Sequence, residues 1–397
     1  MVRYSVEDLK EEMVLGESIF LPSGELLLAA GYKIKERYRE RLKQLGYNSV
    51  LIELEGTEEV VPAETVSPEA QRQMVQNMDS SSKDLANAFV QFRHKSTEHV
   101  KDLIKTNRQA LSKFIMTSGM MKALEQFIDE IMNQNSIVLN LSAMQHTQPE
   151  LLNHAMNVTI TSLCIGKKYK FSYEEMKQLG IGAINYDLGL IALPKELLAK
   201  KHSELSEEEI QAYRQHTVYG YIMLTQNPVI PATSAAVALQ HHERQDGTGF
   251  PQKLKGDNRP PLKDFSRQNM IHRFAEIVSV ANTYDKLLTG RDGDPAEKMN
   301  ARQAIKELIS MSGKVLNSEI VKMFLTMVPL YPVGARVRIL DAPTPQLVGY
   351  LGVVAKDNLE NLEAPQIILY ETKNHQKIKP ILVDVSKYKG FELELVI

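Results

Sequence analysis

Residues 143 to 328 carry an almost unbroken helical pattern, and no other feature constrains the fold as strongly. Prolines and glycines, which end helices, divide this stretch at Pro149, Pro194, Pro228 and Pro231, in the loop 247–261 and between Gly290 and Pro295. Amphipathic helices of this length are stable only when they share an apolar core. The predicted fold class is therefore mainly α, with an all-helical domain over residues 143–328.

The flanking regions have a different character. Residues 1–55 contain short apolar runs broken by Pro-Ser-Gly and Ala-Gly, and then a helical pattern over residues 34–45. They predict a small α+β N-terminal module. Residues 329–397 show β-branched alternation separated by turn residues, which predicts a small β-rich C-terminal extension.

Two segments connect the first module to the helical domain. Residues 56–82 carry acidic residues, two prolines and a serine run, so their composition predicts a linker. Residues 83–142 predict a helical connector, with apolar positions at steps of three, four and seven, among them Leu85, Phe89, Phe92, Leu103, Leu111 and Ile115. The apolar face of this connector must pack against another apolar surface. It either packs on the helical domain or forms a homodimer with a second copy.

Composition excludes several classes of partner. The formal net charge of -2 gives no reason to expect a nucleic acid polymer. The single cysteine, Cys164, rules out a disulfide within the chain and favours a reducing, cytoplasmic location. No run approaches the roughly 18 apolar residues of a membrane span, and the acidic N-terminus lacks the apolar core of a signal peptide. We expect no membrane insertion.

Six residues of the helical domain have the chemistry of metal ligands. Glu150 and His154 are four residues apart, so they share one helix face. Asp187 lies in the apolar segment INYDLGLIALP, where a buried carboxylate needs a partner.

The other three are histidines. His216 lies in a further helical segment, and His241 and His242 are adjacent. Adjacent helical residues diverge by about 100°, so this pair can serve two centres. Imidazole and carboxylate ligands suit iron, manganese or zinc, and the number of ligands suits a site for two or three metals.

Four segments, in this order and spacing, resemble the motifs of the HD-GYP domain family. NYDLGLIALP resembles HDIGK-x-x-x-P, RQHTVYGYIML resembles His-x-x-x-G, HHERQDGTGFP resembles HHE-x-x-DG-x-GYP, and RFAEIVSVANTYDKLLTGR resembles R-I-x-x-V-A-D-x-Y-D-A-L-T-x-R. The resemblance implies an all-helical, HD-type, metal-dependent phosphodiesterase fold that acts on the bacterial second messenger cyclic di-GMP. The N-terminal module and the C-terminal extension also resemble segments that flank such domains.

The sequence departs from the family pattern at four positions. Tyr186 replaces the His of His-Asp, Leu190 replaces the following Lys, Phe250 replaces the Tyr of GYP, and Asn282 replaces the late Asp. In the family, the replaced His and late Asp are terminal ligands of one metal. The Asp that corresponds to Asp187 bridges to a second metal, and the Lys lies near the substrate phosphate.

Each departure has a chemical consequence. A tyrosine ligates only as phenolate, and its ordinary pKa is about 10. Asn282 keeps an oxygen donor but loses a charge, Leu190 removes a cation, and Phe250 removes only a hydroxyl. We therefore expect an incomplete site in which one metal position is lost. Asp187 is the candidate catalytic residue if hydrolysis survives.

The resemblance also assigns ligand contacts. Gly249, Phe250 and Pro251 are expected to shape the ligand pocket, and Arg291 occupies the position of a family arginine that resembles a phosphate or guanine contact. The alternative for Arg291 is a solvated loop arginine.

Three functions remain open. The protein is a degenerate effector that binds cyclic di-GMP or protein partners, an active phosphodiesterase with an altered metal set, or a structural protein that binds no nucleotide. The joint loss at Tyr186, Leu190 and Asn282 favours the first function.

Overall fold

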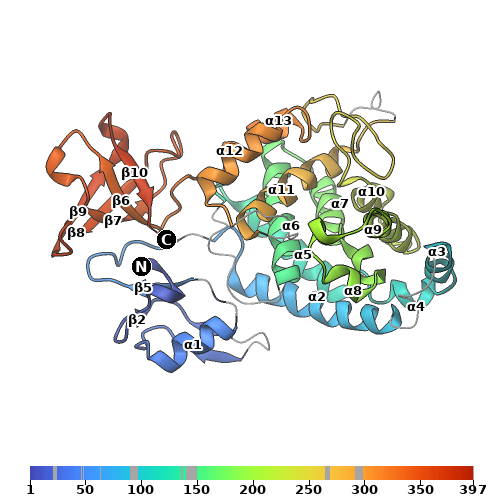
Figure 1. Ribbon diagram of the computed structural model, residues 1–397, viewed down its shortest axis with the longest axis horizontal. Coiled ribbons are helices and arrows are strands. Elements are labelled where there is room, and N and C mark those ends of the chain that lie inside the picture. Colours follow the sequence, from blue (N-terminus) through green and yellow to red (C-terminus); the bar gives the residue numbers. More distant parts are fainter. Residues whose placement is uncertain are drawn as a thin grey trace. The chain divides into compact units, whose positions relative to one another are not determined.

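The computed structural model describes residues 1–20, 25–45, 47, 49–62, 64–89, 97–135, 137–139, 150–263, 269–290 and 298–396. The chain divides into two compact units (Figure 1). The helical unit comprises Val66–Ile137 and Glu150–Thr326, and the β unit comprises Met1–Thr65, Val138–Pro149 and Met327–Ile397. The predicted fold class, mainly α with small sheets near both ends of the chain, is confirmed.

Serine and asparagine caps start several helices of the helical unit. Ser172, Ser206 and Asn300 each form a capping box with the residue three positions later, so the side chains satisfy backbone N–H groups that the helix leaves unpaired. The helices are α2 (Pro68–Phe89), α3 (Thr97–Thr106), α4 (Arg108–Ser112), α5 (Ser118–Asn133), α6 (Glu150–Lys168), α7 (Tyr173–Ile184), α8 (Lys195–Leu198), α9 (Glu207–Thr225), α10 (Ala232–Gln240), α11 (Arg273–Thr289), α12 (Ala301–Met311) and α13 (Ser318–Leu325), with the 3-10 helices η3 (Leu188–Ala192) and η4 (His202–Glu204).

Helix α6 forms the centre of this unit. It packs against α5, α7 and α11 (Figure 1), and Val158, Ile160, Leu163 and Ile165 are fully buried. Residues on every side of the helix are buried, which requires other helices around it. Helix α10 packs against α7 and α9, and α9 packs against η3. These contacts bring residues 187, 216 and 241 together.

The predicted linker 56–82 is wrong from Pro68 onward, because α2 begins there. Ala70, Met74 and Met78 are buried at four-residue spacing, and this apolar stripe outweighs the serine run that suggested a linker. Ser81 is itself buried, with its hydroxyl 3.5 Å from Met120 Sδ.

The predicted connector 83–142 is part of the helical unit as far as residue 137. Helix α2 packs on α5, α6 and η3, while α3 and α4 pack on α9. Leu85, Phe89, Leu111 and Ile115 are buried by these contacts, whereas Phe92 lies outside the described residues. The helical domain thus covers this apolar face.

The β unit combines both ends of the chain. One sheet has the order β1-β5-β2, a hairpin pairs β3 with β4, and a five-stranded sheet has the order β10-β6-β7-β8-β9. Helix α1 (Glu36–Gln44) accompanies the strands β1 (Val2–Ser5), β2 (Val14–Leu15), β3 (Ile19–Phe20), β4 (Leu26–Leu28), β5 (Ser49–Glu53), β6 (Arg336–Asp341), β7 (Leu351–Lys356), β8 (Gln366–Glu371), β9 (Lys377–Asp384) and β10 (Glu392–Leu395).

The prediction of separate N-terminal and C-terminal modules is corrected by their shared core. Val2 and Val337 belong to one buried cluster. The Arg3 N–H donates to the Gly334 carbonyl at 2.8 Å, and Arg336 pairs with Asp8 at 2.6 Å. Local patterns do not reveal pairings between residues so far apart in the sequence.

Candidate metal centre

A close backbone contact sets the geometry of the site. Asp187 is the residue immediately before η3, at its N-cap position, and His216 lies in the middle of α9. A Cβ atom at Gly189 would lie 1.9 Å from the His216 carbonyl oxygen and 2.6 Å from the Gly220 nitrogen. Only glycine at position 189 therefore allows η3 to approach α9 closely enough for the Asp187 carboxylate to reach His216.

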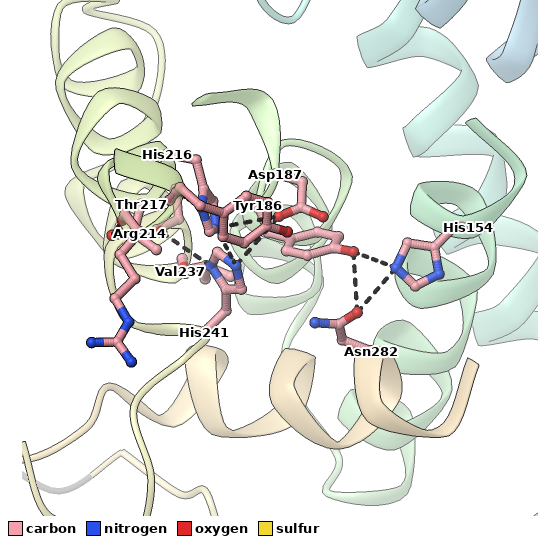
Figure 2. Close-up of polar contacts among 11 residues, drawn as sticks. His154, Tyr186, Asp187, Arg214, His216, Thr217, Val237, His241 and Asn282 are labelled. Carbon is pink, nitrogen blue, oxygen red and sulfur yellow. Dashed lines mark hydrogen bonds and ion pairs between the residues drawn. The ribbon is translucent and has the colours of Figure 1, made fainter. Parts of the chain in front are cut away.

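Four of the predicted ligands come together. One potential ligand atom from each of Asp187, His216, His241 and His242 lies within 4.8 Å of all the others. Asp187 Oδ1 is 3.4 Å from His241 Nε2 and 3.7 Å from His216 Nε2 (Figure 2). This group of four residues is called the Asp-His group below.

Backbone carbonyls orient two of the imidazoles. His216 Nδ1 lies 2.7 Å from the Tyr213 carbonyl, and His241 Nδ1 lies 3.0 Å from the Ala238 carbonyl. Each Nδ1–H donates to its carbonyl, which leaves an unprotonated Nε2 pointing into the group, as in metal-bound histidines. The two Nε2 atoms are 3.4 Å apart, and a cation between them would relieve the repulsion of their lone pairs.

The charge state of the group also fits a cation. Burial lowers the pKa of His216 to about 4, and burial together with the charges of His241, His216 and Lys286 holds the pKa of His242 well below its ordinary value. Burial would raise the pKa of Asp187, but its interactions with His241, His216 and Lys286 outweigh burial and hold this pKa well below its usual range. A carboxylate and neutral imidazoles are the donor set of a divalent metal.

His154 lies outside the Asp-His group because its own hydrogen bonds occupy both ring nitrogens. Its Nδ1 donates to Asp285 Oδ2 at 2.6 Å, and its Nε2 lies 2.6 Å from the Tyr186 hydroxyl oxygen. Asn282 Oδ1 lies 3.0 Å from His154 Nε2 and accepts a hydrogen bond from the Tyr186 hydroxyl at 3.2 Å (Figure 2). Asn157 donates to Asp285 Oδ1 at 2.8 Å. All five side chains are buried.

Tyr186 lies between His154 and the Asp-His group. Its ring meets the His241 ring edge-on, with centroids 4.9 Å apart, and its hydroxyl is bonded to His154. The model therefore brings four of the six predicted ligands together and keeps His154 apart from them. Glu150 begins α6, but its side chain lies outside the description.

The predicted ligand-binding loop borders a pocket. Gly249, Phe250 and Pro251 line a cavity of about 400 Å³ together with Gln211, Arg214, Gln215, Thr248 and Lys253. A Cβ atom at Gly249 would lie 2.5 Å from Glu243 Cα, so only glycine fits this turn. The Phe250 ring stacks on His242, with centroids 4.5 Å apart.

The remaining predicted positions are partly described. Leu190 is buried in η3. Arg291 lies outside the described residues.

Sequence reasoning missed several polar residues around the site. Asp285 and Lys286 follow Asn282 at three and four positions, so α11 presents all three on one face. Arg214 precedes His216 by two positions on α9 and lines the pocket. The spacing of three and four positions from Asn282 could have identified Asp285 and Lys286 from the sequence. No sequence pattern singled out Arg214.

Comparisons with known proteins agree with this architecture. Residues 138–320 match the family model of the HD domain. A cyclic di-GMP phosphodiesterase of Pseudomonas aeruginosa is 24% identical over 266 residues, which are 66% of this chain and 58% of that protein. A cyclic di-GMP phosphodiesterase response regulator of Xanthomonas campestris pv. campestris is 32% identical over 163 residues, which are 41% of this chain and 39% of that protein.

A solved structure, an HDG"Y"P protein from Bdellovibrio bacteriovorus, is similar over 81% of this chain and 97% of its own, at 19% identity and a TM-score of 0.43. The chain spans less than two thirds of the length of each of the two curated relatives, both of which are named cyclic di-GMP phosphodiesterases. Among the described helices, none is both long enough and apolar enough to cross a bilayer.

Proposed function

We propose that this protein is a degenerate HD-GYP effector of cyclic di-GMP signalling. It binds the nucleotide and hydrolyses it weakly or not at all. The HD domain and its relatives, which are named cyclic di-GMP phosphodiesterases, support the ligand class. The substitutions at Tyr186, Leu190 and Asn282 support the loss of turnover.

One observation carries this proposal: the Tyr186 hydroxyl occupies His154 Nε2 at 2.6 Å. The nitrogen that would otherwise serve a metal is used in a buried hydrogen bond. Asn282, which is also part of this network, brings no negative charge to balance a dication. The position that the sequence marks as lost is therefore filled by protein atoms.

The Asp-His group fits a single divalent metal, which we take to be iron, manganese or zinc. When bound there, the metal supplies a Lewis acid for a phosphate oxygen. Hydrolysis of phosphodiesters in two-metal sites uses a second ion to stabilise the attacking or leaving oxygen. Leu190 presents an apolar side chain where the family has a lysine. The remaining groups suit binding better than cleavage.

The biological output of such an effector is a change in its contacts. Nucleotide binding shifts the population of conformations that partner proteins recognise. We place this interaction in the cytoplasm, because the chain has a single cysteine. We propose that protein partners recognise this change. A homodimer through residues 83–142 is a further contact that we propose.

An active phosphodiesterase with an altered metal set is the second candidate. The intact Asp-His group favours it. The positive charge of Lys286, which contributes to lowering the pKa values of Asp187, His216 and His242, also favours it. A cation on α11 offers compensation for the lysine that is missing at position 190.

Three measurements on the full chain separate the candidates: metal content by mass spectrometry, calorimetric titration with cyclic di-GMP, and chromatography of the products with Mn²⁺ or Fe²⁺. We expect about one metal per chain, saturable binding, and little linear or mononucleotide product. Two metals per chain with rapid hydrolysis would establish the second candidate. A chain that binds neither metal nor nucleotide would be a structural protein.

A further inference from the structure

The pocket beside the Asp-His group has a distinctly positive lining. Arg214 and Lys253 are its charged residues, and the lining contains no carboxylate. Gln211, Gln215 and Thr248 add neutral polar groups. A pocket with this composition attracts an anion that also carries hydrogen-bonding groups.

The charges of the two basic residues are available to a ligand. In the part of the chain that the structure describes, no carboxylate forms an ion pair with the Arg214 guanidinium or the Lys253 ammonium group. The Arg214 guanidinium instead lies over the Phe250 ring, 5.1 Å from its centroid. Figure 2 shows the Arg214 side chain extending away from His154 and Asn282.

Phe250 connects this pocket to the Asp-His group. Its ring stacks on His242 with an angle of 17° between the planes, and it also contacts Arg214. The pocket and the candidate metal centre thus share one aromatic side chain. This shared side chain makes the pocket and the Asp-His group neighbours.

We propose that the Arg214 pocket binds one phosphate of a nucleotide whose other phosphate lies at the Asp-His group. This inference rests on the proposed function and assigns the contacts. Arg214 binds the phosphate oxygens through its planar guanidinium, and Lys253 adds a second positive charge. Gln211, Gln215 and Thr248 are the hydrogen-bonding groups for the sugar or base edge.

The test uses calorimetric titration of the metal-loaded full chain with cyclic di-GMP and, separately, with GMP. Arg214→Ala is expected to weaken binding about 10- to 100-fold, the usual effect of losing one charge-assisted hydrogen-bonding group. Arg214→Lys should weaken binding less, because the charge remains while the fork geometry is lost. Lys253→Ala tests the second cation in the same way.

Arg244→Ala is the matched control. Arg244 is an exposed arginine near the same loop, with Nη1 3.5 Å from Thr248 Oγ1, but it does not line the pocket. Its removal changes the net charge by the same amount and should leave affinity nearly unchanged. Metal content is measured for every variant and should equal that of the wild type, because none of these residues belongs to the Asp-His group.

The outcomes separate this inference from the proposed function. If cyclic di-GMP binds the wild type and the Arg214 and Lys253 variants equally well, the pocket assignment is overturned and the effector function stands. If the wild type binds only GMP, and Arg214→Ala abolishes this binding, the phosphate subsite stands and the cyclic dinucleotide is the wrong ligand. Binding of neither probe overturns both.

Discussion

The Tyr186 hydroxyl lies 2.6 Å from His154 Nε2, and both side chains are buried. The neutral phenol thus contacts a nitrogen that metal sites commonly use, and it donates to Asn282 Oδ1 at 3.2 Å. The Asp285 carboxylate holds the other side of the imidazole at 2.6 Å. The result is a hydrogen-bonded chain of carboxylate, imidazole and phenol that is complete without an ion.

Removing this hydroxyl should destabilise the helical unit. Tyr186→Phe removes the hydroxyl that contacts His154 Nε2 and donates to Asn282 Oδ1 in a buried site, which costs about 1 to 3 kcal/mol. Urea denaturation of the metal-free protein measures the change. Tyr284→Phe is the control, because that ring is also buried and its hydroxyl has no hydrogen-bond partner among the described residues. Equal stability of Tyr186→Phe and wild type would contradict the prediction.

Restoring the residues of the family pattern should create a second metal position. In the double variant Tyr186→His and Asn282→Asp, an imidazole and a carboxylate face His154 in place of the phenol and the amide. We expect metal content to rise by about one ion per chain, since these are ordinary ligands of transition metals. Mass spectrometry of protein loaded with Mn²⁺ or Fe²⁺ measures it. An unchanged metal content would show that the hydrogen-bonded network is not what excludes the ion.

Removing a ligand from the Asp-His group should abolish stable metal binding. His241→Ala deletes an imidazole whose Nε2 lies 3.4 Å from Asp187 Oδ1. The affinity should fall by more than the roughly 10- to 100-fold that loss of an outer-shell partner costs. Competition with a chelator measures the affinity. His202→Ala, which removes an exposed histidine of η4, is the control and should bind metal like the wild type.

The contact between Gly189 and His216 can be tested by adding one methyl group. In Gly189→Ala the Cβ would lie 1.9 Å from the His216 carbonyl oxygen, so η3 must move away from α9. We expect a loss of about 1 to 3 kcal/mol in stability together with weaker metal binding. Gly166→Ala is the comparison, because its Cβ would meet only side-chain atoms, none closer than 3.0 Å. Wild-type metal affinity in Gly189→Ala would refute this account of the site.

The ion pair between Glu175 and Arg273 predicts a dependence of stability on pH. Burial opposes ionisation of Glu175, but the bond from Arg273 at 2.6 Å and the bonds from Ser172 outweigh it and lower the pKa to about 2. The ordinary value is 4.5. Because the folded pKa is depressed, the unfolded chain binds more protons between these values, and this contribution to stability is lost as pH falls from about 4.5 towards 2.

Glu175→Gln removes that contribution. At pH 7 the variant should be less stable by about 1 kcal/mol, a figure that allows for solvent screening of this partly exposed pair. The difference from the wild type should shrink as pH falls below about 4.5. Denaturation midpoints at a series of pH values measure it, with Glu174→Gln as the neighbouring control. A difference that stays constant down to the lowest pH would exclude this linkage.

Local patterns in the sequence account for the helices and for part of the site. Capping residues mark the start of the helix after Ser206, for example, because Ser206 and Glu209 form a capping box within three positions. The motif spacing identified Asp187, His216 and His241, which the model brings together. The acidic residues, prolines and serines of 56–82 suggested a linker. The buried stripe of Ala70, Met74 and Met78 instead stabilises a helix from Pro68 onward.

Long-range pairs account for what the sequence did not predict. His154 and Asp285 are separated by 131 positions, and no periodic pattern links them. The substitution at residue 186 suggested a missing ligand, but not that its hydroxyl would bond to His154. The same limit applies to the β unit, in which Asp8 and Arg336 form an ion pair.

That ion pair joins residues 328 positions apart, with the whole helical unit between them in the sequence. Chains are synthesised from the N-terminus, and domains fold as their residues become available. The helical unit has all of its residues once Thr326 has been made. The buried cluster that contains Val2 is complete only after β6 has also been made. Strand β1 is thus made before the helical unit, but the buried cluster that contains Val2 is completed only after the helical unit, when β6 has been synthesised.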